Sequence, residues 1–302
     1  MNKLRVSLAP IEHFSLSGEQ QNLEDIEVLR SFFCGYLKKQ HGVFTQNGRS
    51  ALSIVLEQLE LTRSDEVWIT TSFDYPNVSS CVTSTVFNFC KPSRVFSTST
   101  KAVLMIHEFG VVHPRRDEVL KLAREHGIPL IEDCAHTFMS SDSLGFKAGE
   151  LGDWTIISFP KFYPVRRGGM LLSHEKLSTR DNLAQPLLGE LEFVSGMIGQ
   201  TDAFGQMRRE VLSYFIKATR ELGLTSPMFE IHSDVVGWFF PVSVPNAVFY
   251  FEALLARGVD CCIWHGAQII ALPLHQYLIS VDQSFVMEML AEVNGMWREQ
   301  SY

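Results

Sequence analysis

Residues 129–169 constrain the fold of this chain more than any other stretch, because two apolar runs in them each lead to a chemically active side chain. The first run ends in the acid pair Glu132 and Asp133, and the second, at 154–159, is followed by Lys161. Short apolar runs of this kind are typical of buried strands in a parallel sheet. Ligands of open α/β sheets bind beyond the carboxyl ends of the strands, so the acid and the lysine are expected to face one ligand.

A carboxylate and a lysine at one site suit a particular cofactor. Pyridoxal 5'-phosphate needs a lysine amine that reacts with its aldehyde and an acid that keeps its ring nitrogen protonated. The protonated ring can then withdraw electrons from a bound substrate. Asp133 and Lys161 are therefore predicted to hold this cofactor, and no metal is expected.

The flanking segments alternate between short apolar runs and amphipathic helical patterns, which predicts an α/β protein. A helix is predicted from Leu23 onward, with Ile26, Leu29, Phe33 and Leu37 on one face. The run at 102–106, a helical pattern stopped by Gly127, and the run at 128–131 predict a parallel strand–helix–strand crossover. The expected large domain has a mostly parallel central sheet flanked by helices.

The composition changes after Pro227, where the segment GWFFPVSVPNAVFYFEALLARGVDCCIWH has the pattern strand, helix, strand. A final amphipathic helix is predicted at 284–297. This order predicts a small α+β domain. We expect a large cofactor-binding domain at 1–190, a linking helical segment at 191–230 and the small C-terminal domain at 231–302.

The overall composition excludes several classes of protein. The formal net charge of −8 argues against a nucleic-acid partner or a polybasic membrane surface. No apolar run approaches the roughly 20 residues that span a bilayer, and the first residues lack the apolar core of a secretory signal. Six cysteines without a CxxC pair are typical of a reducing compartment. The expected location is the cytoplasm.

A phosphate site is predicted at the start of a helix. The turn Asn47-Gly48 precedes a helical pattern, so Gly48, Arg49 and Ser50 would lie at a helix N-terminus. Free backbone N–H groups and the helix dipole attract phosphate there. The alternative is a helix that Ser50 merely caps after an Asn-Gly turn. Tyr75, in the loop after a predicted strand, would either stack on a flat cofactor ring or serve simple packing.

Six segments resemble, in the same order, motifs of the DegT/StrS aminotransferases, which are fold-type-I pyridoxal phosphate enzymes acting mainly on nucleotide-linked keto sugars. These segments are NGRSAL, SFDYP, TKAVLMIHEFG, GIPLIEDCAH, GELGDWTIISFPK and ALPLHQYL. The resemblance runs over about residues 42–173 and 234–278. Each motif alone is weak, but their common order makes the combination specific.

The resemblance implies roles for single residues. Lys161 is expected to hold the cofactor as a Schiff base and then to carry a proton, which requires a lowered lysine pKa. Asp133 is expected to pair with the pyridine nitrogen, His136 to contact the ring hydroxyl and Tyr75 to stack on the ring. The cofactor phosphate is expected to be bound by Gly48, Arg49, Ser50 and Ser158.

Each role has an alternative. Asp133 would otherwise cap a helix, and Lys161 would otherwise be a surface lysine, with Lys147 as the second candidate for the cofactor link. The family usually has a longer spacing between the strand serine and the lysine. Arg166 and Arg167 either meet an anionic group of the substrate or form a solvated basic loop.

One family feature is missing. Members usually carry an asparagine-rich segment after the lysine strand, which reaches the cofactor phosphate of the partner subunit. Between residues 175 and 227 this chain has a single asparagine, Asn182, in a different context. The chain is also shorter than most members, so a trimmed substrate site or weaker cofactor binding is expected.

The predicted function is that of a homodimeric transaminase. It would move an amino group from an amino acid, with glutamate the expected donor, to a keto sugar linked to a nucleotide, in the synthesis of a surface polysaccharide or secondary metabolite. The expected partners are these small molecules and a second copy, without nucleic acid or membrane. The alternatives are a cofactor-dependent sugar dehydratase, against which Lys161 argues because histidine replaces the lysine there, and a non-catalytic binding or regulatory descendant.

Overall fold

A seven-stranded sheet forms the larger half of the computed structural model, which describes residues 5–8, 23–73, 75, 77–78, 80–178, 187–230, 234–264 and 266–300. The strand order is β1-β7-β6-β5-β4-β2-β3, and only β7 runs antiparallel to its neighbours. The predicted mostly parallel sheet is therefore confirmed. The strands are β1 (His41–Thr45), β2 (Glu66–Thr71), β3 (Lys91–Ser93), β4 (Thr100–Ile106), β5 (Leu130–Asp133), β6 (Trp154–Ser158) and β7 (Gly169–Ser173).

Both faces of this sheet are covered, because alternate side chains of each strand point to opposite sides. Ala102 and Leu104 of β4 pack in one apolar cluster with α2 (Gly48–Gln58) and α3 (Ser80–Phe87). Val103 and Met105 pack on the other face with α4 (Arg116–His126). The helix α1 (Leu23–Tyr36) buries the face predicted from its sequence, and α5 (Leu187–Ser195) packs against it.

Two helix ends follow local sequence rules. Gly127 ends α4 in the left-handed conformation, with φ of 62°, as predicted. The start of α2 differs from the expected cap, because the side chain of Asn47, rather than that of Ser50, accepts the hydrogen bond from the Ser50 amide at 3.0 Å. Asparagine is as good a cap as serine, and here it precedes the first helical residue.

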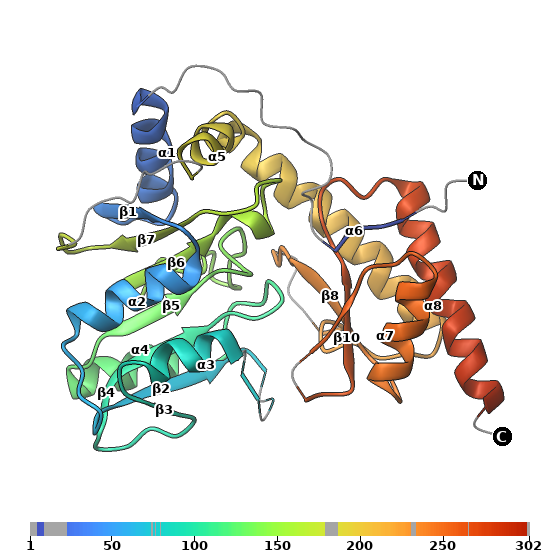
Figure 1. The fold of residues 1–302 in the computed structure, drawn as a ribbon, viewed down its shortest axis with the longest axis horizontal. Coiled ribbons are helices and arrows are strands. Elements are labelled where there is room, and N and C mark those ends of the chain that lie inside the picture. Colours follow the sequence, from blue (N-terminus) through green and yellow to red (C-terminus); the bar gives the residue numbers. More distant parts are fainter. Residues whose placement is uncertain are drawn as a thin grey trace.

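The smaller half is a three-stranded antiparallel sheet packed against helices (Figure 1). Its strands, in the order β8-β10-β9, are β8 (Phe239–Ser243), β10 (Ile269–Pro273) and β9 (Cys262–Ile263), and its helices are α6 (Thr201–Glu221), α7 (Ala247–Ala256) and α8 (Ser280–Gln300). The predicted strand, helix, strand and final helix are all present, and α8 starts earlier than expected. Apolar residues of α6 such as Phe215 join this core. The exact domain boundaries stay a prediction.

The two halves are in close contact beside the end of β4. Gly110 has φ of 93°, and a Cβ atom there would lie 2.5 Å from the carbonyl oxygen of Val236. Only glycine allows the backbones to approach this closely. The segment that leads into β8 therefore lies directly over the strand ends that carry the predicted site. Among the described residues, no helix combines the length and hydropathy needed to cross a bilayer.

Candidate active site

A cavity of about 410 Å³ lies between the carboxyl ends of the large sheet and the small sheet. Such a volume is in the usual range of small-molecule sites. The large half contributes Asp133, His136 and Lys161 to its lining, and the small half contributes Trp238 and Trp264. The fold thus brings together three residues that the sequence predicted for one site.

Asp133 is the last residue of β5 and is buried, with 9% of its surface exposed. Its Oδ1 accepts a hydrogen bond from the backbone amide of Ala135 at 3.0 Å. Burial raises the pKa of Asp133, while the charge of Lys161 opposes this rise. A buried carboxylate at the end of β5 is suited to pair with a protonated ring nitrogen.

Lys161 ends the short 3₁₀ turn Phe159–Lys161, which follows β6 and contains Pro160 in its first turn. Its Nζ lies 4.4 Å from the ring centroid of Trp238. Burial lowers the pKa of Lys161 to about 8, and the carboxylate of Asp133 limits this fall. A substantial fraction of the amine is therefore uncharged just above neutral pH.

The backbone of the lysine turn is held by the small half. Arg208 of α6 is fully buried and donates hydrogen bonds to the carbonyl oxygen of Lys161, at 2.9 Å, and to the side chain of Gln276, at 2.8 Å. Gln276 in turn donates to the carbonyl oxygen of Phe162 at 2.8 Å. Because Gln276 lies in the late segment ALPLHQYL, the last of the six sequence motifs contributes to the position of Lys161.

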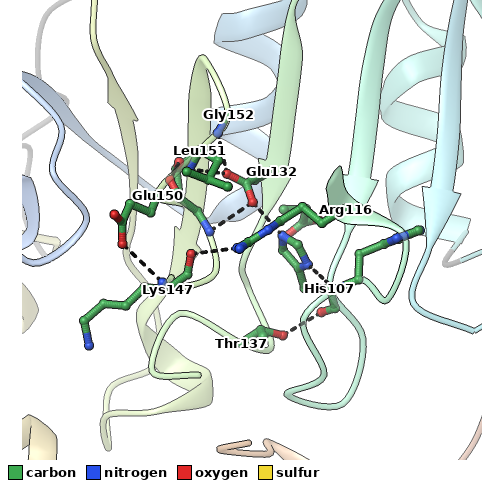
Figure 2. Close-up of polar contacts among 12 residues, drawn as sticks. His107, Arg116, Glu132, Thr137, Lys147, Glu150, Leu151 and Gly152 are labelled. Carbon is green, nitrogen blue, oxygen red and sulfur yellow. Dashed lines mark hydrogen bonds and ion pairs between the residues drawn. The ribbon is translucent and has the colours of Figure 1, made fainter. Parts of the chain in front are cut away.

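Glu132 links β5 to neighbouring segments through hydrogen bonds (Figure 2). It is fully buried, and its Oε1 lies 3.0 Å from Nε2 of His107. Burial alone would raise the pKa of Glu132, but the hydrogen bond to His107 and the backbone amides together lower it to about 2. Glu132 therefore stays ionised next to Asp133 in the chain. The amides that donate to it are those of Gly149, Leu151 and Gly152.

His107 follows β4, contacts Glu132 and is one of the residues that line the cavity. Its Nδ1 accepts the backbone amide of His113 at 2.9 Å, so its Nε2 carries the hydrogen that is donated to Glu132. The carbonyl oxygen of His107 accepts the hydroxyl of Thr137 at 2.7 Å (Figure 2). Both ring nitrogens are thus used, and His107 is a fixed part of the cavity wall.

Replacement of Glu132 by glutamine is expected to lower the free energy of unfolding by about 2–4 kcal/mol, because an amide nitrogen would face backbone N–H donors in a buried site. A depressed carboxyl pKa stabilises the fold above pH 4.5, and that stabilisation is lost as the pH falls toward 2. Glu132→Gln should therefore also weaken the acid dependence of stability. Urea unfolding at several pH values measures both effects. Glu118→Gln, at an exposed site, is the control, and an unchanged midpoint in Glu132→Gln would contradict the assigned role.

The predicted phosphate residues also meet at one place. The first intrahelical bond of α2 joins the Ala51 amide to the Asn47 carbonyl at 3.2 Å, so the amides of Gly48 and Arg49 precede the hydrogen-bonded part of the helix. A Cβ atom on Gly48 would lie 3.9 Å from that of Ser158, which places the helix start beside the end of β6. The Arg49 side chain is exposed. This helix start has the backbone donors that a phosphate needs.

Tyr75 lies elsewhere. Its ring packs against that of Phe73, with centroids 5.9 Å apart, and it does not line the cavity. The aromatic residues that line the cavity include instead Trp238, Phe239 and Trp264, and the His136 ring lies 4.6 Å from that of Trp238. Reasoning from the sequence missed Trp238, whose only signal was the apolar run GWFF. A stacking role for Tyr75 stays a prediction.

The alternative cations have other partners. The Lys147 ammonium lies 3.9 Å from the centroid of the Tyr36 ring and outside the cavity lining, which leaves Lys161 as the better placed lysine. Nε of Arg167 pairs with Glu190 at 3.2 Å, whereas Arg166 is exposed. Asn182 lies outside the described residues.

The fold is that of the α/β aminotransferases. The structure is similar to the putative sugar aminotransferase Spr1654 from Streptococcus pneumoniae, with a TM-score of 0.81 and 14% identity over 99% of this chain and 100% of that one. It is also similar to Helicobacter pylori PseC, an aminotransferase involved in the biosynthesis of pseudoaminic acid. The TM-score is 0.74 and the sequence identity 12%, over 97% of this chain and 100% of that one. At these identities the likeness concerns the fold.

The chain belongs to the DegT/DnrJ/EryC1/StrS aminotransferase family, whose model matches residues 11–88 and 92–181, more than half of its length. It is 29% identical over 170 residues to GDP-perosamine synthase of Vibrio cholerae, covering 50% of this chain and 45% of the relative. It is 26% identical over 235 residues to a putative L-glutamine:3-amino-2,3-dideoxy-scyllo-inosose aminotransferase of Streptoalloteichus tenebrarius. That match covers 65% of this chain and 56% of the relative. The chain therefore spans about half the length of the curated relatives it matches.

Proposed function

We propose that this protein is a pyridoxal phosphate-dependent aminotransferase that moves an amino group from an amino acid to a keto sugar. The observation that carries the proposal is the shared cavity of Asp133 and Lys161 at the ends of adjoining strands. Membership of the aminotransferase family supports it. The relatives whose names refer to perosamine and inosose support a sugar or a similar polyhydroxy ketone as acceptor, and a nucleotide-linked sugar is the first candidate.

The residues present fit the cofactor. When bound, pyridoxal phosphate supplies an electron-withdrawing ring that lets a proton leave the substrate carbon next to nitrogen. Lys161 would hold it covalently through Nζ, and the carboxylate of Asp133 would keep a proton on the ring nitrogen. The amides of Gly48 and Arg49, with Ser158 beside them, would bind the phosphate.

Lys161 is also the proposed proton carrier. Its uncharged Nζ would accept the proton that leaves the substrate carbon next to nitrogen and would donate it again at a second atom. A pKa of about 8 leaves this amine able to do both near neutral pH. The enclosed cavity, with Trp238 against the amine, limits the access of water to the reacting atoms.

Glutamate is the proposed amino donor. Glutamine, which is part of the name of one relative, is the alternative donor to be compared with it. A homodimer in the cytoplasm is the proposed working form, as the resemblance to the family implies. Light scattering after gel filtration tests the dimer.

The reaction is tested by its first half. Protein loaded with pyridoxal phosphate should convert it to the pyridoxamine form when L-glutamate or L-glutamine is added, with one keto acid released for each cofactor. The absorbance of the cofactor and the amount of keto acid measure this conversion, and a sample without amino acid is the control. If none of the twenty amino acids causes conversion, the proposed function is wrong.

A second candidate is a regulatory descendant without catalysis. It is supported by 23% identity over 210 residues to a pleiotropic regulatory protein of Geobacillus stearothermophilus, covering 62% of this chain and 55% of the relative. Cofactor binding without conversion by any amino acid would favour it. A sugar dehydratase is the less supported alternative, because Lys161 lines the cavity, and analysis of the products from a keto sugar would identify it.

A further inference from the structure

Glu108 is a carboxyl group in the cavity that none of the proposed cofactor contacts uses. It lies just beyond the end of β4 and lines the same cavity as Asp133 and Lys161. Only 3% of its surface is exposed. Buried acids require hydrogen-bond partners, so the contacts of this side chain are informative.

The protein uses only part of the hydrogen-bonding capacity of the Glu108 carboxyl group. Its Oε2 accepts the backbone amide of Phe73 at 3.1 Å, and its own amide donates to the hydroxyl of Ser72 at 3.1 Å. Within the described part of the chain, no group donates a hydrogen bond to Oε1. One carboxyl oxygen of a cavity-lining residue is therefore available to a ligand.

The backbone after Glu108 is held in an unusual conformation. Phe109 has φ of 54°, which costs energy for a residue with a side chain, and its ring is fully buried against Trp264 at 4.5 Å. The next residue, Gly110, is pressed against the backbone of Val236. These contacts with the small half hold the backbone next to Glu108 in place.

The surroundings of Glu108 are mostly apolar. Burial raises the pKa of Glu108 to about 7, although the Phe73 amide and the charge of Arg94 lower it in part. Around neutral pH the carboxyl group exists in both forms, so it can donate as well as accept a hydrogen bond. Among the residues that the structure describes, the titratable or charged groups near it or in the same cavity are Tyr75, Cys81, Arg94, His107, Asp133, His136, Lys161 and Cys262.

We propose that Glu108 binds a hydroxyl group next to the keto carbon of the acceptor, which would make the acceptor a polyhydroxy ketone. This inference rests on the proposed function. The keto carbon must come to Lys161, and because Glu108 lines the same cavity we place a neighbouring substituent of the acceptor against it. A neutral hydroxyl costs less to bring into an apolar cavity than an ammonium group does, and it matches a carboxyl group that both donates and accepts.

The test uses two ketones, scyllo-inosose and 2-deoxy-scyllo-inosose, which differ by one hydroxyl next to the carbonyl. The amino form of the wild-type enzyme should favour scyllo-inosose by roughly 10- to 100-fold in kcat/KM, the value of one buried hydrogen bond to substrate. Glu108→Ala should remove this preference, mainly through a higher KM for scyllo-inosose. Glu108→Gln should keep most of it, because an amide also donates and accepts.

Two further readouts separate recognition from a structural role. Cofactor affinity and the half-reaction with L-glutamate should be unchanged in both Glu108 variants, and Glu118→Gln at the surface should match the wild type throughout. The preference of the wild type should change with pH near 7, and that of Glu108→Gln should not.

Each other outcome has a meaning. Equal losses for both ketones in Glu108→Ala would overturn the inference in favour of a structural role. Equal losses in Glu108→Gln and Glu108→Ala would overturn it in favour of a charged partner such as an ammonium group. An intact half-reaction with L-glutamate, but no turnover of either ketone, would overturn the polyhydroxy ketone as acceptor. A wild type without any half-reaction would refute the proposed function, and this inference would fall with it.

Discussion

Replacement of Lys161 by alanine is expected to abolish the covalent link to pyridoxal phosphate and to reduce transamination by roughly 10³- to 10⁴-fold. Within the described part of the chain, Lys161 is the one lysine that lines the cavity. Its amine is partly desolvated, with a pKa of about 8, so both its nucleophilic and its proton-carrying forms are populated near neutral pH. Alanine removes both functions and leaves the turn that carries it, because the carbonyl oxygen of residue 161 still accepts from Arg208.

The link is measured by reduction with borohydride and mass spectrometry of the peptides. In the wild type the reduced cofactor should be found on Lys161, and in Lys161→Ala it should be absent. Lys147→Ala is the matched control, since Lys147 packs on Tyr36 outside the cavity and was the second candidate. A reduced adduct that persists in Lys161→Ala would end the assignment.

The same lysine sets a pH dependence. Only the uncharged amine attacks the cofactor aldehyde, and burial lowers the pKa of Lys161 to about 8. The rate of cofactor attachment to the free protein should therefore rise with pH up to about 8 and level off above it. A lysine with its usual pKa would give a rate that still rises well above this pH.

Replacement of Asp133 by asparagine is expected to reduce turnover by about 10²- to 10³-fold, with little loss of stability. An asparagine side chain can still accept the Ala135 amide, so the local fold should persist. It has no charge with which to hold a proton on the ring nitrogen. Since the carboxylate of Asp133 raises the pKa of Lys161, this replacement should also lower the lysine pKa further below 8.

Single-turnover kinetics with L-glutamate measure the first effect, and the pH profile of cofactor attachment measures the second. Asp117→Asn, on the exposed side of α4, is the control for the loss of one negative charge. Wild-type turnover in Asp133→Asn would show that another acid acts on the ring. If the pH profile of cofactor attachment instead shows a higher pKa for Lys161, this would contradict the electrostatic link between the two residues.

The fold could be predicted from the sequence because its strongest signals are local. The apolar runs that became β4, β5 and β6 are short and bounded by turns, and their ends supplied Asp133 and Lys161. The ends of neighbouring parallel strands lie at one sheet edge, so a one-dimensional pattern was enough to place these two residues at one cavity. The start of α2 was likewise predicted by the Asn-Gly turn, apart from the identity of the capping side chain.

The part of the cavity that the small half contributes could not be predicted from local sequence signals. Trp238 and Trp264 reach the cavity from the small sheet, and Arg208 of α6 and Gln276, in the turn after β10, hold the lysine turn from positions far along the chain. The hydrophobic periodicity of the sequence does not predict which part of the small half lies over the strand ends of the large sheet. Tyr75 packs against Phe73 and does not line the cavity, although its place after a strand suited a stacking role.

The sequence by itself determined the acid and the lysine at two strand ends and the helix start that would bind a phosphate. The tertiary structure alone decided how these groups are buried, and hence their chemistry. The lowered pKa of Lys161 and the raised pKa of Glu108 both arise mainly from burial in the folded protein. Desolvation depends on atoms that are remote in the chain, so it appears only once the two halves are packed together.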